Sequence, residues 1–85
     1  MEIVVTDKAR EDLNFWKKSG NVTIQKRISE LLNAIVLSPY EGIGKPEPLK
    51  HKLSGTWSRR INKEHRVVYE VDEKRVVILS LKGHY

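Results

Sequence analysis

The sequence contains no cysteine, and this absence excludes disulfide bonds, thiolate metal sites and cysteine nucleophiles. It also lacks a long hydrophobic run, because the longest mainly apolar stretch, residues 76–81, is far too short to span a bilayer. The N-terminal segment MEIVVTDKARED has charges on both sides of a short apolar stretch, which is not the pattern of a signal peptide. We therefore expect a cytoplasmic protein.

The motifs of several enzyme classes are also missing. The segment GIGK at residues 42–45 lacks the length and the following helix of a phosphate-binding loop. No serine lies in a nucleophile motif, the carboxylates are not clustered, and the spacing of His51 and His65 matches no metal-ligand signature. We therefore expect neither a metal ion nor another cofactor.

What the sequence does contain is a concentrated positive charge. The chain has 85 residues, of which 16 are Lys or Arg and 11 are Asp or Glu, giving a formal net charge of +5. Residues 45–69 alone hold seven of these cations but only two acids, so the charges of the remaining residues cancel. A chain of this length predicts one domain, residues 1–85. The cationic stretch suits a polyanion such as RNA, although charge alone does not distinguish nucleic acid from a membrane surface or an acidic protein.

Hydrophobic periodicity predicts a short strand followed by two helices. Residues 2–6 are rich in β-branched side chains and predict a buried strand. Ala9, Leu13 and Trp16 follow the spacing of an amphipathic helix that Gly20 ends.

The second helix begins at about Asn21, and Pro39 ends it. Its apolar stripe comprises Ile24, Ile28, Leu31, Leu32 and Ile35. Residues 39–48, PYEGIGKPEP, contain all three prolines and predict an ordered loop.

Three more strands are predicted at residues 56–61, 65–71 and 76–82, joined by turns so short that they require antiparallel hairpins. The predicted order is therefore β-α-α-β-β-β, an α+β fold. Two helices can cover one face of such an antiparallel-rich sheet and leave the other face open.

Side chains alternate between the two faces of a strand, so each predicted strand has an inward and an outward set. The inward set comprises Trp57, Arg59, Ile61, Val67, Tyr69, Val71, Val77, Leu79 and Leu81. The outward set comprises Ser58, Arg60, Arg66, Val68, Ser80, Lys82 and, if the last strand continues, His84. We therefore expect Arg60, Arg66, Lys82 and His84 to share the open face. A bulge in any strand would reverse this assignment.

Glu47 lies between Pro46 and Pro48, which restrict the backbone on both sides and hold it extended at low entropic cost. One interpretation is an ordinary solvated loop glutamate. The other is a general base, positioned by a stiff loop and tuned by nearby cations such as Lys50 and Lys52.

Three other side chains are candidates for the same chemistry. His84 is a candidate because a histidine can give or take a proton near neutral pH, unless the chain end simply frays. Tyr85 can stack on a base. Arg66 can brace a phosphate, unless it is a surface arginine paired with Glu64 or Glu70.

RNA cleavage by the 2′-hydroxyl of the RNA itself needs no nucleophile from the protein. It needs a base for that hydroxyl, cations for the pentavalent phosphorane and an acid for the 5′-oxygen. Glu47, Arg66 with neighbouring lysines, and His84 would fill these roles. A substrate without a 2′-hydroxyl could not react.

Three segments of the sequence are distinctive: GIGKPEPLKHKLSGTWSRRI at residues 42–61, EHRVVY at residues 64–69, and the terminal His84-Tyr85. They resemble the YoeB/Txe family of bacterial toxins, a RelE-like group from type II toxin–antitoxin systems, and the resemblance covers the full length. It implies a small RelE-like RNase fold. It also implies an mRNA interferase, a ribosome-dependent endoribonuclease that cuts mRNA in the ribosomal A site.

The resemblance also implies partners. They are the ribosome with its mRNA and a cognate antitoxin of the YefM/Axe type, which would form a heteromeric complex with the toxin and block its site. A homodimer remains open, and no membrane partner is expected.

Carried over residue by residue, the family's catalytic residues fall on Glu47, Arg66, His84 and Tyr85. Its basic contacts to RNA and the ribosome fall on Lys50, His51, Arg59 and Arg60, to which the charge pattern adds Lys52 and Lys82. Gly83 stands where some relatives carry a bulky side chain, and a glycine there is expected to loosen the chain end.

Two other functions remain open. A non-catalytic basic module that binds RNA or an acidic partner would use the same cations but would not depend on Glu47 or His84. A related toxin scaffold that acts on a protein such as gyrase is a third interpretation, against which the complete Glu, Arg, His and Tyr set argues.

Overall fold

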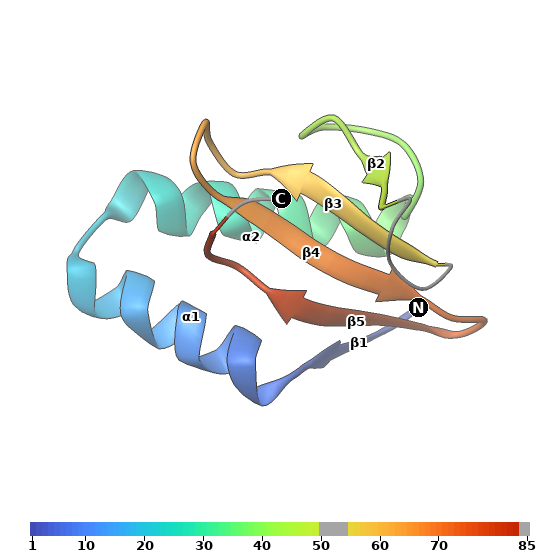
Figure 1. Cartoon of the computed structure of the whole chain (residues 1–85), viewed down its shortest axis with the longest axis horizontal. Coiled ribbons are helices and arrows are strands. Elements are labelled where there is room, and N and C mark those ends of the chain that lie inside the picture. The colour runs from blue at the N-terminus through green and yellow to red at the C-terminus, as the bar shows by residue number, and fades with distance from the viewer. Residues whose placement is uncertain (50–54, 84–85) are drawn as a thin grey trace.

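The elements follow one another in the predicted order, with one short strand added. The computed structural model describes residues 1–49 and 55–83. Its elements are β1 (Glu2–Val5), α1 (Asp7–Ser19), α2 (Val22–Leu37), β2 (Glu47–Pro48), β3 (Thr56–Arg60), β4 (Arg66–Val71) and β5 (Arg75–Ser80). The sequence predicted all of them except β2, and the α+β fold class is confirmed (Figure 1).

Local signals define both ends of α1. The Thr6 hydroxyl accepts a hydrogen bond from the Ala9 N–H at 3.2 Å, which satisfies one of the free donors of the first turn. Gly20 ends the helix in the left-handed conformation, with a φ of 72° that glycine adopts without steric cost. Ala9 and Trp16 are buried, as the predicted stripe requires.

Helix α2 is bounded in a similar way. Asn21 Oδ1 accepts a hydrogen bond from the Ile24 N–H at 3.1 Å, and the helix ends at Leu37, shortly before Pro39. Its buried residues are Ile24, Ile28, Leu31 and Ile35, which belong to the predicted stripe. Within residues 1–49 and 55–83, no helix is long and apolar enough to cross a membrane.

In the described part of the chain, the sheet has five strands in the order β1-β5-β4-β3-β2. β1 pairs in parallel with β5, and the other pairs are antiparallel, so the predicted antiparallel-rich sheet is confirmed. Figure 1 shows α2 passing behind β3 and β4, whereas no helix crosses the near face of these strands. We call this face, which no helix crosses, the outer face.

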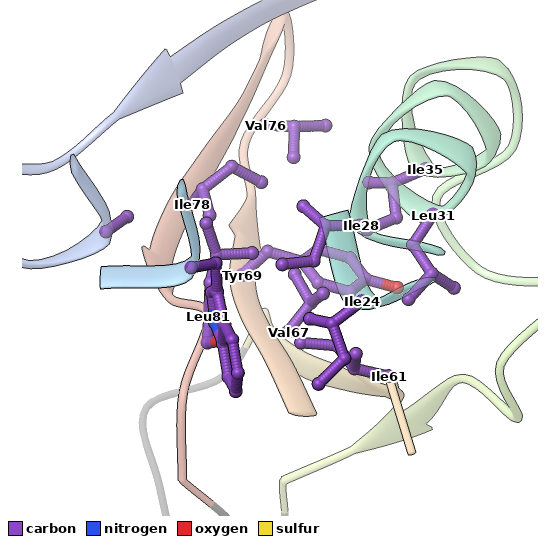
Figure 2. Close-up of a cluster of buried hydrophobic side chains, with 12 residues drawn as sticks. Ile24, Ile28, Leu31, Ile35, Ile61, Val67, Tyr69, Val76, Ile78 and Leu81 are labelled. Carbon is purple, nitrogen blue, oxygen red and sulfur yellow. The ribbon is translucent and has the colours of Figure 1, made fainter. Parts of the chain in front are cut away.

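One hydrophobic core joins the helices to the sheet (Figure 2). It contains Ala9 and Trp16 of α1, the buried stripe of α2 and inward residues of β4 and β5. Val67 and Tyr69 are fully buried, so their predicted inward positions are confirmed. Figure 2 shows the Tyr69 side chain projecting from β4 toward α2.

The predicted faces of β5 are wrong for most of the strand. Val76 and Ile78 are fully buried in the core. Val77 and Leu79, which were expected to point inward, alternate with them and therefore point to the outer face.

A β-bulge explains why the predicted faces are wrong for Val77 and Leu79 and correct again at Ser80 and Leu81. Tyr69 pairs with Ile78, but the preceding residue of β4, Val68, pairs with Ser80, so β5 contains one additional residue between these pairs. An additional residue reverses the alternation. As a result Ser80 shares the outer face with Val68, and Leu81 is buried in the core, both as the sequence predicted.

Candidate active site

Strand pairing arranges the residues of the outer face in rows. Glu47 of β2 pairs with Ser58 of β3, and Ser58 pairs with Val68 of β4. Arg60 and Arg66 form a separate row beside this one. Because directly paired residues of antiparallel strands point to the same face, Glu47 and both arginines lie on the outer face.

The Arg66 side chain lies between Glu47 and Ser58. Its Nη1 is 3.8 Å from Glu47 Oε2 and donates a hydrogen bond of 3.4 Å to Ser58 Oγ. The Arg66 side chain is 17% exposed and that of Glu47 is 53% exposed, so solvent reaches the carboxylate and weakens the ion pair. Of the partners considered from the sequence, neither Glu64 nor Glu70 takes this position; the guanidinium faces Glu47 instead.

The row formed by Arg60 and Arg66 brings two guanidinium groups to neighbouring strands. Arg60 is exposed, whereas most of Arg66 is covered. Like charges at directly paired positions repel each other. An anion bound between them would relieve the repulsion, and guanidinium groups match the geometry of phosphate oxygens. The outer face can therefore hold a phosphate beside the Glu47 carboxylate.

The backbone around Glu47 is as extended as its two prolines predict. Glu47 and Pro48 form β2, and beyond it the Leu49 N–H donates to the Thr56 carbonyl at 2.9 Å. Before β2, Lys45 adopts a left-handed φ of 51°, which is uncommon for a residue with a side chain. A sharp turn thus delivers Glu47 to the edge of the sheet.

Arg59 does not contact RNA as expected, because its side chain is fully buried on the inner face. Its guanidinium donates hydrogen bonds to the carbonyls of Ser38, Glu41 and Ile43 and to the Tyr69 hydroxyl. These acceptors lie at the end of α2, in the following loop and on β4. Arg59 therefore fastens the loop that leads to Glu47, and its predicted role in RNA binding is wrong.

Tyr69 completes this buried network. Its hydroxyl accepts from Arg59 Nε at 3.1 Å and donates to the Pro39 carbonyl at 2.7 Å. Burial raises the pKa of Tyr69, although the hydrogen bond from Arg59 acts in the opposite direction. The neutral hydroxyl can thus serve as donor and acceptor at once.

Two glycines allow the loop to wrap closely around Arg59. A Cβ at Gly44 would lie 2.7 Å from Leu31 Cδ2 and 3.0 Å from Arg59 Cβ, and one at Gly42 would lie 3.3 Å from Arg59 Nη1. The Gly44 carbonyl also accepts a hydrogen bond of 2.6 Å from the Arg60 N–H. The short segment from α2 to Glu47 is thus packed tightly against β3.

At the other end of the chain, α1 holds the backbone of Leu81. The buried carboxylate of Asp12 accepts the Leu81 N–H at 2.9 Å, and Trp16 Nε1 donates to the Leu81 carbonyl at 2.9 Å. Lys8 donates to both oxygens of Asp12, which compensates the buried charge. The chain leaves β5 along a fixed path.

Lys82 does not lie on the outer face, so this expectation is wrong. β5 ends at Ser80, and the strand alternation therefore does not extend to Lys82. The ammonium instead lies 3.8 Å from the centre of the Phe15 ring on α1. This distance is typical of a cation–π contact.

The last described residue, Gly83, is bound to the start of β4. Its N–H donates to His65 Nδ1 at 2.9 Å, and its carbonyl accepts from the Arg66 N–H at 2.9 Å. The expectation that Gly83 loosens the chain is therefore not supported up to this residue. The predicted site residues Lys50, His51, Lys52, His84 and Tyr85 lie outside the described residues.

Sequence reasoning missed three residues that hold the site together: Ser58, Asp12 and His65. Asp12 gave a signal, since an acid on the apolar stripe of a helix is costly unless it has a partner. Ser58 was assigned to the outer face, but no pattern indicated its contact with Arg66. His65 was considered only as a possible metal ligand, and its spacing from His51 matched no ligand signature.

Comparison with known proteins places this chain in a family. The model of the YoeB-like toxin of bacterial type II toxin-antitoxin systems matches residues 5–85. Toxin YoeB of Synechocystis sp. is 46% identical over 85 residues, which cover 100% of this chain and 98% of that protein.

Solved structures agree. The YoeB dimer from Staphylococcus aureus superposes with a TM-score of 0.90 at 44% identity, and the YoeB-YefM complex from the same organism with 0.86 at 45%. Each comparison covers 100% of this chain and 98% of the other. The predicted RelE-like fold is therefore confirmed by its YoeB structural neighbours. This chain belongs to the YoeB family of toxins from bacterial type II toxin–antitoxin systems.

Proposed function

We propose that this protein is an mRNA interferase, a ribosome-dependent endoribonuclease that cleaves mRNA in the ribosomal A site and so inhibits translation. The observation that carries this proposal is the pair of Glu47 and Arg66 on the outer face, with 3.8 Å between carboxylate and guanidinium. Membership of a toxin family supports it, because cutting message is a direct way to stop growth.

The chemistry uses the RNA as its own nucleophile. Glu47 accepts the proton of a 2′-hydroxyl, whose oxygen then attacks the adjacent phosphorus. Arg66, with Arg60 beside it, stabilises the additional negative charge of the pentavalent phosphorane. The bond from phosphorus to the 5′-oxygen breaks, and His84 donates a proton to that oxygen. The products are a 2′,3′-cyclic phosphate and a 5′-hydroxyl, while Tyr85 stacks on a neighbouring base.

The family resemblance and the position of the site support the proposed dependence on the ribosome. Glu47, Arg60 and Arg66 lie on the face of a sheet, and a free single strand must be ordered before its 2′-hydroxyl aligns with the phosphorus. A ribosome already holds the message in an ordered state. The contacts expected at Lys50, His51 and Lys52 would bind the toxin to this RNA-rich surface.

The proposal includes protein partners. A YoeB-YefM complex and a YoeB dimer are known from Staphylococcus aureus, and we propose that this chain likewise binds a YefM-like antitoxin and can self-associate. The net charge of +5 would attract an acidic antitoxin segment toward the site. Both partners, like the ribosome, would be met in the cytoplasm.

The decisive experiment adds purified protein, freed of antitoxin, to ribosomes that translate a defined message. We expect cuts within the reading frame, mapped by primer extension. Glu47→Gln and His84→Gln should each reduce the cleavage rate by about 10²- to 10⁴-fold, as is typical for loss of a general base or acid. Both variants should keep the circular dichroism spectrum of the parent.

The alternative of a non-catalytic RNA-binding module makes the opposite prediction. Such a module would bind message with similar affinity in all three proteins and would leave it intact. Uncut message in the presence of the parent protein would therefore refute the proposed activity, and cleavage at the parental rate by both variants would refute the assigned roles.

A further inference from the structure

The backbone of Gly83, the residue before His84, is bound at both its N–H and its carbonyl oxygen. Gly83 donates its N–H to His65 Nδ1, and it accepts the N–H of Arg66 at its carbonyl oxygen, each at 2.9 Å. Two bonds, one to the residue just before β4 and one to the first residue of β4, fix the orientation of Gly83 as well as its position. His65 and Arg66 thus hold the last described residue before His84.

The imidazole of His65 is itself firmly placed. Its side chain is only 18% exposed, and its ring meets the ring of Trp16 edge to face, with 4.9 Å between the centroids. Trp16 is buried and donates to the Leu81 carbonyl, so the same indole supports the imidazole and the chain that approaches it. A ring held by packing can orient a hydrogen bond more strictly than a mobile side chain can.

The tautomer of a neutral His65 ring follows from its acceptor role. An imidazole nitrogen that accepts an N–H is unprotonated, so the proton of the neutral ring is on Nε2. A carboxylate oxygen of Glu64 lies 3.8 Å from Nε2, and its negative charge favours a proton on that nitrogen. The side chain is therefore suited to accept the Gly83 N–H and not to act as the acid of the reaction.

We propose that His65 is a positioning residue, which orients the Gly83 backbone and thereby supports the proton transfer assigned to the next residue, His84. This inference rests on the proposed ribonuclease function, in which His84 is the acid. The Arg66 backbone binds Gly83 while its side chain faces Glu47. Arg66, the first residue of β4, thus contacts both the proposed base and the residue that precedes the proposed acid.

Two variants of His65 separate an orienting hydrogen bond from simple packing. His65→Phe keeps an aromatic ring against Trp16 but removes the acceptor. His65→Asn gives up the ring but offers an amide oxygen close to the place of Nδ1. If His65 acts only through packing, His65→Phe should be the more active variant. If His65 acts as an orienting acceptor, His65→Asn should be the more active variant.

The activity measurement is single-turnover cleavage of message on programmed ribosomes, with toxin affinity for the ribosome measured separately. We expect His65→Phe to cleave about 10- to 100-fold more slowly at unchanged affinity, because small misplacements of a catalytic group have effects of this size. His65→Asn should stay within about 3-fold of the parent by the same reasoning. Parental cleavage by His65→Phe, or a greater loss in the Asn variant than in the Phe variant, would overturn the proposal.

A second measurement tests the hydrogen bond in the free protein, without ribosomes. In uniformly ¹⁵N-labelled protein, an N–H···N bond gives a scalar coupling between the Gly83 amide nitrogen and His65 Nδ1. We expect this coupling in the parent and faster amide exchange of Gly83 in His65→Phe. If the coupling is missing, the positioning role is wrong even if the protein cleaves mRNA. If the coupling is present but the parent does not cleave, the ribonuclease function fails, and the proposed role of His65 fails with it.

Discussion

At the scale of single residues, Arg59 and Arg60 show how one step along a strand decides the role of a cation. Arg60 points to the outer face and is exposed, whereas Arg59 is fully buried. The acceptors around the Arg59 guanidinium are main-chain carbonyls and the hydroxyl of Tyr69. One of the carbonyls belongs to Ser38, the C-cap of α2, where the helix dipole presents partial negative charge. Arg59 is thus a structural cation and Arg60 is available to a ligand.

This contrast gives a stability prediction. Arg59→Met should lower the free energy of unfolding by about 3 kcal/mol or more, because several buried acceptors lose their donor at once. The matched change Arg60→Met should alter it by no more than about 0.5 kcal/mol, as is usual for exposed positions. Urea unfolding followed by tryptophan fluorescence measures both. Similar losses in the two variants would mean that the buried network contributes little.

At the scale of elements, the segment between α2 and β2 controls the approach to Glu47. Its glycines lie where the chain turns around Arg59 and where side chains would collide with β3 or α2. Gly44 has a φ of 86° and a close neighbour in Leu31, so both its backbone and its surroundings require glycine.

Gly44→Ala separates crowding from backbone strain when it is compared with Gly20→Ala. Both positions have positive φ, but a Cβ at Gly20 has nothing within 4 Å. We expect Gly20→Ala to cost about 1 kcal/mol from backbone strain, and Gly44→Ala about 1–3 kcal/mol more from overpacking. Thermal unfolding gives the stabilities, and the mRNA cleavage assay shows whether Glu47 has moved. Equal losses of stability in the two variants would show that the loop accommodates a Cβ at position 44 without an overpacking cost.

The elements that the sequence predicted correctly are those with a local pattern. The helices, the residues that end them and the hairpins depend on local patterns, and they were found. Strand β2 has only two residues, which is too few to show any periodicity. The bulge in β5 has no local signature either, since residues 76–79 are all apolar and show no alternation, and it reversed the predicted faces of Val77 and Leu79.

The candidate site was predictable to a similar extent. Alternation placed Arg60 and Arg66 on one face, and the flanking prolines indicated an extended Glu47. Their meeting depends on the pairing of Glu47 with Ser58, a contact between segments that no local pattern reveals. The same alternation also put Arg59 on the inner face, so its burial could have been inferred before a role in RNA binding was assigned.

At the scale of the whole molecule, the cations are divided between opposite sides of the sheet. Arg60 and Arg66 lie on the outer face beside Glu47. Lys26 lies on α2, which covers the other side, and is exposed there. If the outer face binds RNA, only its own cations will displace the counterions of the nucleic acid.

The salt dependence of RNA binding therefore reports which side is used. Binding of a single-stranded RNA, followed by fluorescence anisotropy over a range of salt concentrations, should weaken linearly in logarithmic coordinates. Loss of one phosphate contact in Arg60→Met should reduce the magnitude of the slope by about 0.7, the value expected for single strands. Lys26→Met removes the same formal charge from the helical side, so it should leave the slope unchanged. Equal reductions in the two variants would mean that RNA binding depends only on the total charge of the protein. This result would contradict the prediction that RNA binds to the outer face.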